Sequence, residues 1–140
     1  MIEIKYPLEL KFIRQICQTT SEIAKIGLNQ FIEHKGHTKF LQEIELMTGE
    51  ACTNSIRHAS NPNSGVLILR LILTQNHFEV VVLDQNPKFE FNDIGLPLFN
   101  KIPESGYGIH IIKSLADKVI YTRTGNWNRL HIIKRFSHFL

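Results

Sequence analysis

The chain has 140 residues, of which 43% are hydrophobic and 21% are charged. This length predicts one domain, residues 1–140, with one hydrophobic core, and no apolar run reaches the roughly 18 residues of a membrane-spanning helix. The net charge of +3 is spread along the chain, which argues against nucleic-acid binding because that function needs a clustered basic surface.

The N-terminal segment predicts a short strand followed by a helix. Residues 1–10, MIEIKYPLEL, carry no basic segment followed by an apolar stretch, so we expect no secretory signal and a cytoplasmic location. Residues 2–6 alternate between apolar and polar, the period of a half-buried strand, and Pro7 ends it. A helix is then expected from about Leu8 to Gly36. Its apolar positions, which recur near helical spacing, are Phe12, Ile16, Ile23, Ile26 and Phe31.

A second helix is predicted from His37 or Thr38 to about Ala59. Its apolar stripe, with steps of four, three and four residues, is Phe40, Ile44, Met47 and Ala51. Asn54 and His58 continue this line, and Glu50 lies beside it, four residues before Asn54. A carboxylate and an amide on adjacent turns can face one space, where the amide oxygen reaches a hard cation and the carboxylate a water or hydroxyl. The alternative is a helix whose C-terminal half simply faces solvent.

Two strands are predicted after the turn-forming residues 61–65. Residues 66–74 and 78–84 are rich in β-branched residues and leucine, and the short connection at 75–77 favours an antiparallel hairpin. Asp84 ends the second strand, where a carboxylate needs a hydrogen-bond donor. The exocyclic amine of a nucleobase is one candidate donor, and the backbone of the following turn is the other. Residues 85–105, with three prolines, predict a long loop.

The last third of the chain predicts a helix and a second hairpin. Residues 107–117 show helical periodicity and are entered through Ser105-Gly106-Tyr107-Gly108. Free N–H groups at such a turn can approach a phosphate because the glycines carry no side chain, although a tight turn without a ligand would have the same sequence. Strands at 118–124 and 128–136 follow around a Gly125-Asn126 turn. The order of elements predicts an α+β fold, a two-layer sandwich with the helices on one face of a mostly antiparallel sheet.

The cysteines, histidines and large aromatic residues suggest no further site. Cys17 and Cys52 lie in predicted helices, so we expect buried free thiols rather than a disulfide or zinc site. The seven histidines include no H-E-x-x-H motif, and we expect surface histidines rather than a metal site. Tyr121 and Trp127, in the last hairpin, are expected to be packing residues.

Four strings occur in an order that resembles the bacterial anti-sigma factor serine kinases. They are EACTNSIRHA at 50–59, VVLD at 81–84, PLF at 97–99 and GYGI at 106–109. These small switch kinases belong to the superfamily of histidine-kinase-like ATPases. The resemblance covers nearly the whole chain, and its most specific part is the E-A-x-T-N-x-x-x-H-A string.

The resemblance implies a site for ATP and Mg²⁺ between the helices and the sheet. Glu50 would be the catalytic base that activates the attacking hydroxyl, Asn54 the magnesium ligand, and Asp84 the acceptor of the adenine amine. The glycine turn would frame the triphosphate, and the loop at 85–105 would be the lid. The other residues that the resemblance implies for nucleotide binding are His58, Asn86, Lys88, Gly106, Tyr107, Gly108 and Ile109.

The resemblance also implies partners. Family members phosphorylate a serine on an anti-sigma factor antagonist of the STAS type, and the same surface alternately holds a sigma factor. Direct nucleic-acid or membrane binding is not implied, and a homodimer is compatible with the resemblance.

One departure from the family pattern motivates a second hypothesis. The usual D-x-G-x-G reads Asp84-Gln85-Asn86-Pro87-Lys88 here, so Asn86 and Lys88 stand where glycines are expected. Asparagine tolerates a left-handed backbone better than most residues, and Lys88 would either meet a phosphate or point to solvent. The second hypothesis is therefore a partner-switching module that binds proteins with weak or no use of ATP.

Overall fold

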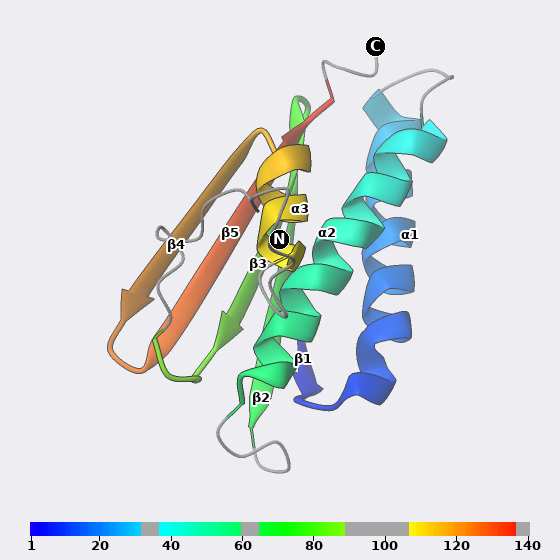
Figure 1. The fold of residues 1–140 in the computed structure, drawn as a ribbon. Coiled ribbons are helices and arrows are strands. Elements are labelled where there is room, and N and C mark those ends of the chain that lie inside the picture. Colours follow the sequence, from blue (N-terminus) through cyan, green and yellow to red (C-terminus); the bar gives the residue numbers. More distant parts are fainter. Residues whose placement is uncertain (32–36, 60–64, 89–106, 137–140) are drawn as a thin grey trace, which may run out of the picture.

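A computed structural model of the chain describes residues 1–31, 37–59, 65–88 and 107–136. They form a five-stranded sheet with helices packed on one face (Figure 1). The helices are α1 (Ile13–Phe31), α2 (His37–Arg57) and α3 (Tyr107–Leu115), with a short 3-10 helix at Leu10–Phe12 before α1. The strands are β1 (Ile2–Pro7), β2 (Val66–Leu73), β3 (His77–Asp84), β4 (Lys118–Thr124) and β5 (Trp127–Arg135). The prediction of a two-layer α+β sandwich is thereby confirmed.

Every neighbouring strand pair in the sheet is antiparallel, and the spatial order is β1-β2-β3-β5-β4. Both predicted hairpins, β2–β3 and β4–β5, are present, and Gly125 has the left-handed φ of +60° that the second turn requires. The pairing of β3 with β5 sets Asp84 opposite Asn128. Because Asn128 is also opposite Arg123 of β4, these three residues form one row across the sheet.

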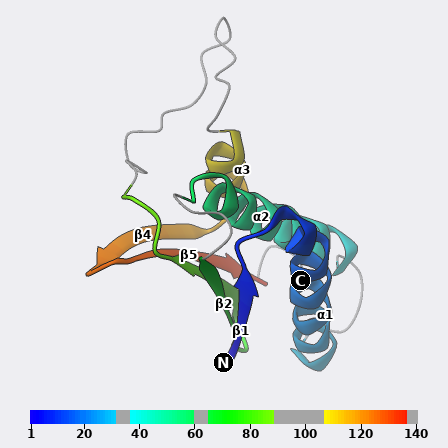
Figure 2. The ribbon, with the colours of Figure 1, turned by 90° about the horizontal axis from the view of Figure 1, so that it is seen from below.

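The hydrophobic core lies between the sheet and the helices, which Figure 2 shows on the same side of the strands. The predicted stripe of α2 is buried in this core, as are alternate residues of β2 and β3. The inward-facing strand residues are Leu67, Leu69, Leu71, Phe78, Val80 and Val82. A smaller cluster of Ile68, Val81 and Leu83, with Trp127 packed against it, occupies the opposite face. Both faces of these strands thus bury apolar side chains, which explains their continuous hydrophobic runs.

Helix α1 differs from its predicted form in two respects. The helix proper begins at Ile13, later than expected, and Ile26 is 63% exposed, so its placement in the apolar stripe was wrong. The buried side chains instead follow steps of four residues and are Ile16, Thr20, Ala24 and Leu28, with Gly27 buried beside them. Thr20 is tolerated there because its hydroxyl donates to the Ile16 carbonyl at 2.8 Å. The predicted helix end at Gly36 lies outside the described residues.

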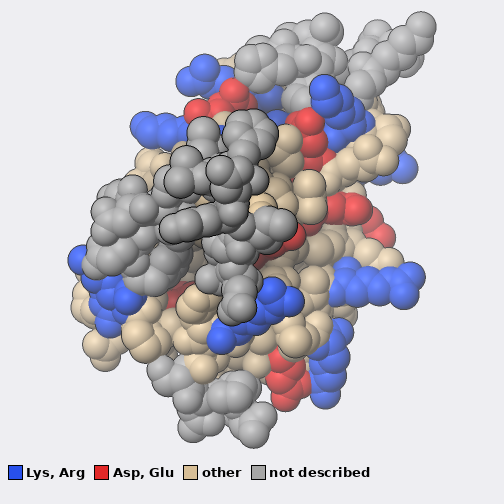
Figure 3. All heavy atoms as spheres, in the orientation of Figure 1, with Lys and Arg blue, Asp and Glu red and all other residues tan. Residues whose placement is uncertain are grey.

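Cys17 and Cys52 are free, as predicted; Cys52 is buried and Cys17 is half-buried. Burial raises the pKa of both thiols, most strongly that of Cys52. Among the helices that the structure describes, none is long and apolar enough to cross a membrane. On the visible face in Figure 3, Lys and Arg side chains are dispersed over the described residues rather than gathered in one basic patch.

Candidate functional site

The C-terminal half of α2 carries the predicted carboxylate and amide as half-buried side chains. Glu50 and Asn54 are both intermediate in exposure, whereas His58, just beyond the helix end, is exposed. The Nδ1 atom of His58 lies 2.8 Å from the Asn54 carbonyl oxygen, so this histidine packs on the last turn of α2. Of the two polar residues that continue the apolar stripe, Asn54 is therefore half-buried and His58 faces solvent.

The first turn of α3 packs directly against Glu50 and Asn54. A Cβ atom added to Gly108 would lie 2.5 Å from Glu50 Oε2 and 3.5 Å from Asn54 Nδ2. Because helix α3 begins at Tyr107, its first N–H groups have no acceptor within the helix and lie beside these two side chains. Tyr107 is 42% exposed, whereas the Ile109 side chain is buried in the core and anchors the helix. Gly106, predicted for the same turn, lies outside the described residues.

Asp84, at the carboxyl end of β3, has three hydrogen-bond donors in the protein. Its Oδ2 accepts a hydrogen bond from the Ser55 hydroxyl of α2. Its Oδ1 accepts from the Asn86 backbone N–H at 3.1 Å and from Asn128 Nδ2 at 2.8 Å. The bond to Asn86 is the turn contact that the sequence allowed for. Because Ser55 directly follows Asn54, Asp84 is tied to the helical turn that carries the amide.

Asn128 is the centre of a buried polar network that sequence reasoning missed. It is 4% exposed, and its amide donates to Asp84 Oδ1 and to the Asn86 carbonyl, each at 2.8 Å. Its Oδ1 accepts from the Tyr121 hydroxyl and from Arg123 Nη1, each also at 2.8 Å. Tyr121 is thus more than the packing residue expected. A signal was present, because Asn128 is polar at an inward position of a strand whose next inward residues are apolar.

The turn after β3 is held from three sides. The Asn86 side chain is buried and donates to the Ser55 carbonyl at 2.6 Å, while the Asn86 carbonyl accepts from Arg123 at 2.9 Å and from Asn128. The side chain that replaces a glycine therefore points toward α2 and fixes the turn. Lys88 is exposed. The rest of the predicted lid, residues 89–105, lies outside the described residues.

Polar groups of α2, of the end of β3 and of the first turn of α3 thus lie along the C-terminal half of α2. Glu50 supplies a carboxylate that can take up a proton, and Asn54 supplies an amide oxygen suited to a hard cation. Asp84 has one hydrogen bond at Oδ2, so this oxygen can accept another from a ligand. Gly108 leaves the backbone N–H groups close to Glu50 and Asn54, and a side chain at this position would have to displace the Glu50 carboxylate.

Comparisons with known proteins give a consistent result. The model of the histidine kinase-like ATPase domain family matches residues 9–134. The chain is 28% identical over 128 residues to serine-protein kinase RsbW of Bacillus velezensis, covering 84% of this chain and 75% of that protein. It is 27% identical over 128 residues to serine-protein kinase RsbW of Bacillus anthracis, covering 84% and 74%.

Solved structures share the fold. The structure of the RsbU and RsbW domains of Rv1364c from Mycobacterium tuberculosis has a TM-score of 0.61 at 13% identity, covering 96% of this chain and 32% of that chain. The histidine kinase domain of a blue-light activated kinase from Erythrobacter litoralis has a TM-score of 0.54 at 20% identity, covering 94% and 62%. The chain therefore spans less than two thirds of either solved chain.

Proposed function

Because this chain belongs to the histidine kinase-like ATPase domain family, we propose that it binds ATP with Mg²⁺ and transfers the γ-phosphate to a serine of an anti-sigma factor antagonist. The observation that carries the proposal is the convergence on α2, where Gly108 packs against Glu50 and Asn54 and Asp84 accepts a hydrogen bond from Ser55. Relatives named serine-protein kinase support the choice of a protein serine as the acceptor.

Each polar group has a role that its position supports. Oδ2 of Asp84 would accept a hydrogen bond from the adenine amine, and Ser55 and Asn128 would hold the carboxylate in place. Asn54 would ligate Mg²⁺, which when bound neutralises charge on the phosphates. The first N–H groups of α3, including that of Gly108, would bind the triphosphate.

Glu50 would act as the base that accepts the proton of the attacking serine hydroxyl. Its carboxylate lies beside the start of α3 and one helical turn before Asn54, which sets the base next to the expected metal and phosphate ligands. Since phosphoryl transfer needs positioning and charge neutralisation more than covalent chemistry, a base and a cation held on one helix suit this reaction.

The partners follow from the same proposal. The acceptor would be a STAS-type antagonist, and a sigma factor would be the alternative binding partner. The second hypothesis, a module with weak or no use of ATP, is less favoured. It rested on Asn86 and Lys88 in place of glycines, but the Asn86 side chain is hydrogen-bonded to α2 and Lys88 is exposed.

Two substitutions on α2 test the proposed roles. We expect Asn54→Ala to abolish the Mg²⁺ dependence of binding of a non-hydrolysable ATP analogue, measured by calorimetry. We expect Glu50→Gln to retain that binding but to slow transfer of labelled phosphate to STAS-type antagonists by about a hundredfold or more, because general-base catalysis contributes on that order. Asn29→Ala, at an exposed position of α1, serves as the control and should change neither quantity.

The results also separate the two hypotheses. Analogue binding in the unchanged protein without any phosphate transfer would favour the partner-switching module. No binding at about millimolar nucleotide, an affinity of only about 4 kcal/mol, would overturn the proposal altogether.

A further inference from the structure

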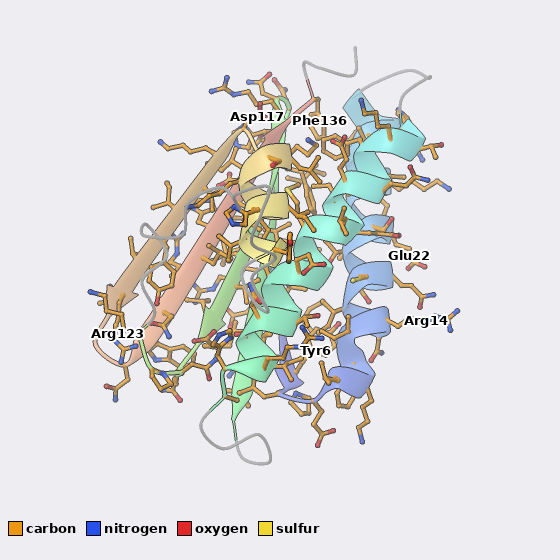
Figure 4. All side chains as sticks on the ribbon, in the orientation of Figure 1. Tyr6, Arg14, Glu22, Asp117, Arg123 and Phe136 are labelled. Atoms are coloured by element: carbon orange, nitrogen blue, oxygen red, sulfur yellow. The ribbon has the colours of Figure 1, made fainter. Side chains whose placement is uncertain are left out.

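A surface depression lies between the turn after β3 and the tip of the β4–β5 hairpin. It is open to solvent, has a volume of about 340 Å³ and is lined by Gln85, Asn86, Pro87, Arg123 and Asn126. Figure 4 shows Arg123 at this end of the hairpin. We refer to this depression as the Arg123 hollow. Its lining contains a cation and three side-chain amides but no carboxylate.

The guanidinium group of Arg123 is bound on one side and open on the other. Its Nη1 donates to the Asn86 carbonyl at 2.9 Å and to Asn128 Oδ1 at 2.8 Å, which uses both hydrogens of that nitrogen. Within the described part of the chain, Nε and Nη2 have no hydrogen-bond or ion-pair partner. Nε and Nη2 form the edge of the guanidinium group that can donate two parallel hydrogen bonds to a carboxylate or phosphate.

The fixed orientation of Arg123 favours ligand binding. An exposed arginine normally loses side-chain entropy when it orders around an anion. Here the two bonds from Nη1 already hold the guanidinium plane against the β3 turn, so less entropy remains to be lost. The exposed amides of Gln85 and Asn126 lie in the same lining and can donate further hydrogen bonds.

We propose that the Arg123 hollow binds an oxyanion, a phosphate or a carboxylate, through Nε and Nη2 of Arg123. This proposal does not depend on ATP binding and can be tested without nucleotide. The proposal also couples the Arg123 hollow to Asp84, because Arg123 and Asp84 both hydrogen-bond to Asn128. An anion that shifts the guanidinium therefore alters the hydrogen bonds that hold Asp84, and by thermodynamic linkage a ligand at Asp84 alters anion affinity.

The test is a nuclear magnetic resonance titration of the ¹⁵N-labelled full chain with inorganic phosphate and, separately, with acetate at matched ionic strength. We expect a saturable shift of the Arg123 Nε–H signal, accompanied by a shift of the Asn128 side-chain NH₂ signal. Saturation by phosphate alone would identify a phosphate ligand, and saturation by acetate alone would identify a carboxylate such as an acidic side chain of a partner.

Three variants make the titration decisive, with anion affinity followed on the Asn128 signal. Arg123→Lys keeps the charge but loses the paired donors, and it should weaken binding about tenfold or more, because one of the two parallel hydrogen bonds to the anion is lost. Gln85→Glu leaves Arg123 intact, sets a competing carboxylate in the hollow and should abolish binding, with thermal unfolding as the check on folding. Arg14→Lys, on an exposed part of α1 (Figure 4), is the matched control and should change nothing.

Two outcomes would overturn the proposal. One is the absence of a saturable shift with either anion. The other is a shift of the same size and midpoint in Arg123→Lys and Gln85→Glu, which would mean that the anion binds elsewhere or only through general charge.

Discussion

Asn128 uses its whole amide inside the protein, donating to Asp84 and Asn86 and accepting from Tyr121 and Arg123. A leucine at this position would fit the inward pattern of β5, but a carboxylate, a carbonyl and two donors would each lose one hydrogen bond. The network therefore fixes the position of the Asp84 carboxylate, and it does not add apolar packing.

We expect Asn128→Leu to lower the free energy of unfolding by roughly 2–4 kcal/mol, because it removes four hydrogen bonds that each contribute about 0.5–1.5 kcal/mol. Urea denaturation followed by circular dichroism measures this change. Asn29→Leu, at an exposed position of α1, should stay within about 0.5 kcal/mol of the unchanged protein. A neutral or stabilising effect of Asn128→Leu would show that the network contributes nothing to the fold.

The sequence predicts some site residues and hides others for a physical reason. Glu50 and Asn54 stand out because helical spacing is local, and Asp84 stands out because it ends an apolar run. The importance of Asn128 depends on the register between β3 and β5, and it lies 44 residues from Asp84. The hydrophobic pattern of a single strand does not determine its register with another strand, so the pairing of Asp84 with Asn128 is seen only in the folded structure.

Helix α3 is fixed at both ends by different elements. Its start packs on α2 at Gly108, and its last carbonyl, that of Leu115, accepts a hydrogen bond from Lys134 Nζ of β5 at 2.6 Å. The same ammonium lies 2.7 Å from Glu43 Oε2 of α2, with side-chain exposures of 5% for the lysine and 17% for the glutamate. Lys134 therefore joins α2, α3 and β5 and fixes the last turn of α3.

We expect Lys134→Met to destabilise the protein by about 3–5 kcal/mol, because it leaves the Glu43 carboxylate poorly solvated and unpaired. Replacing both residues, as in Lys134→Met with Glu43→Leu, should recover most of this loss. Lys11→Met tests an exposed pair, since Lys11 and Glu9 are 72% and 40% exposed, and should cost at most about 1 kcal/mol. Equal costs for the buried and exposed lysines in urea denaturation would contradict this account.

The helices and hairpins follow from local sequence, but their packing does not. The stripe of α2 and the turn at Gly125 were predictable because they depend on periodicity and backbone chirality alone. The exposure of Ile26 was not, since the face of α1 that is buried depends on the close approach of Gly27 to Leu73. A Cβ atom at Gly27 would lie 2.2 Å from Leu73 Cδ1.

The face of the sheet away from the helices carries one carboxylate with a lowered pKa. The face away from the helices carries Glu79, whose carboxylate lies 3.0 Å from His77 Nε2 and also contacts His131 Nε2. Burial alone would raise the pKa of Glu79, but the hydrogen bonds and charges of the two histidines outweigh it and hold the pKa below its ordinary value. Ionised Glu79 is therefore favoured by folding.

This lowered pKa gives a signed prediction for the stability of the whole protein. The contribution of Glu79 is fully present above the ordinary pKa of a glutamate, about 4.3, and is lost as the pH falls through the lower pKa of the folded state. We expect Glu79→Gln to reduce the loss of unfolding free energy between about pH 6 and about pH 3, a range that brackets that value. An unchanged pH dependence in chemical denaturation would exclude this role, with Glu22→Gln on α1 (Figure 4) as the exposed control.

The sheet order has a consequence for how the protein folds. Two hairpins, β2–β3 and β4–β5, can form from residues close in the chain, but β3 meets β5 only when residues far apart in the sequence come together, which is slow. The Asp84–Asn128 hydrogen bond joins β3 to β5. Asp84 therefore gains its hydrogen bond to Asn128 only when the two hairpins dock, and a partly folded chain with undocked hairpins lacks the completed polar network.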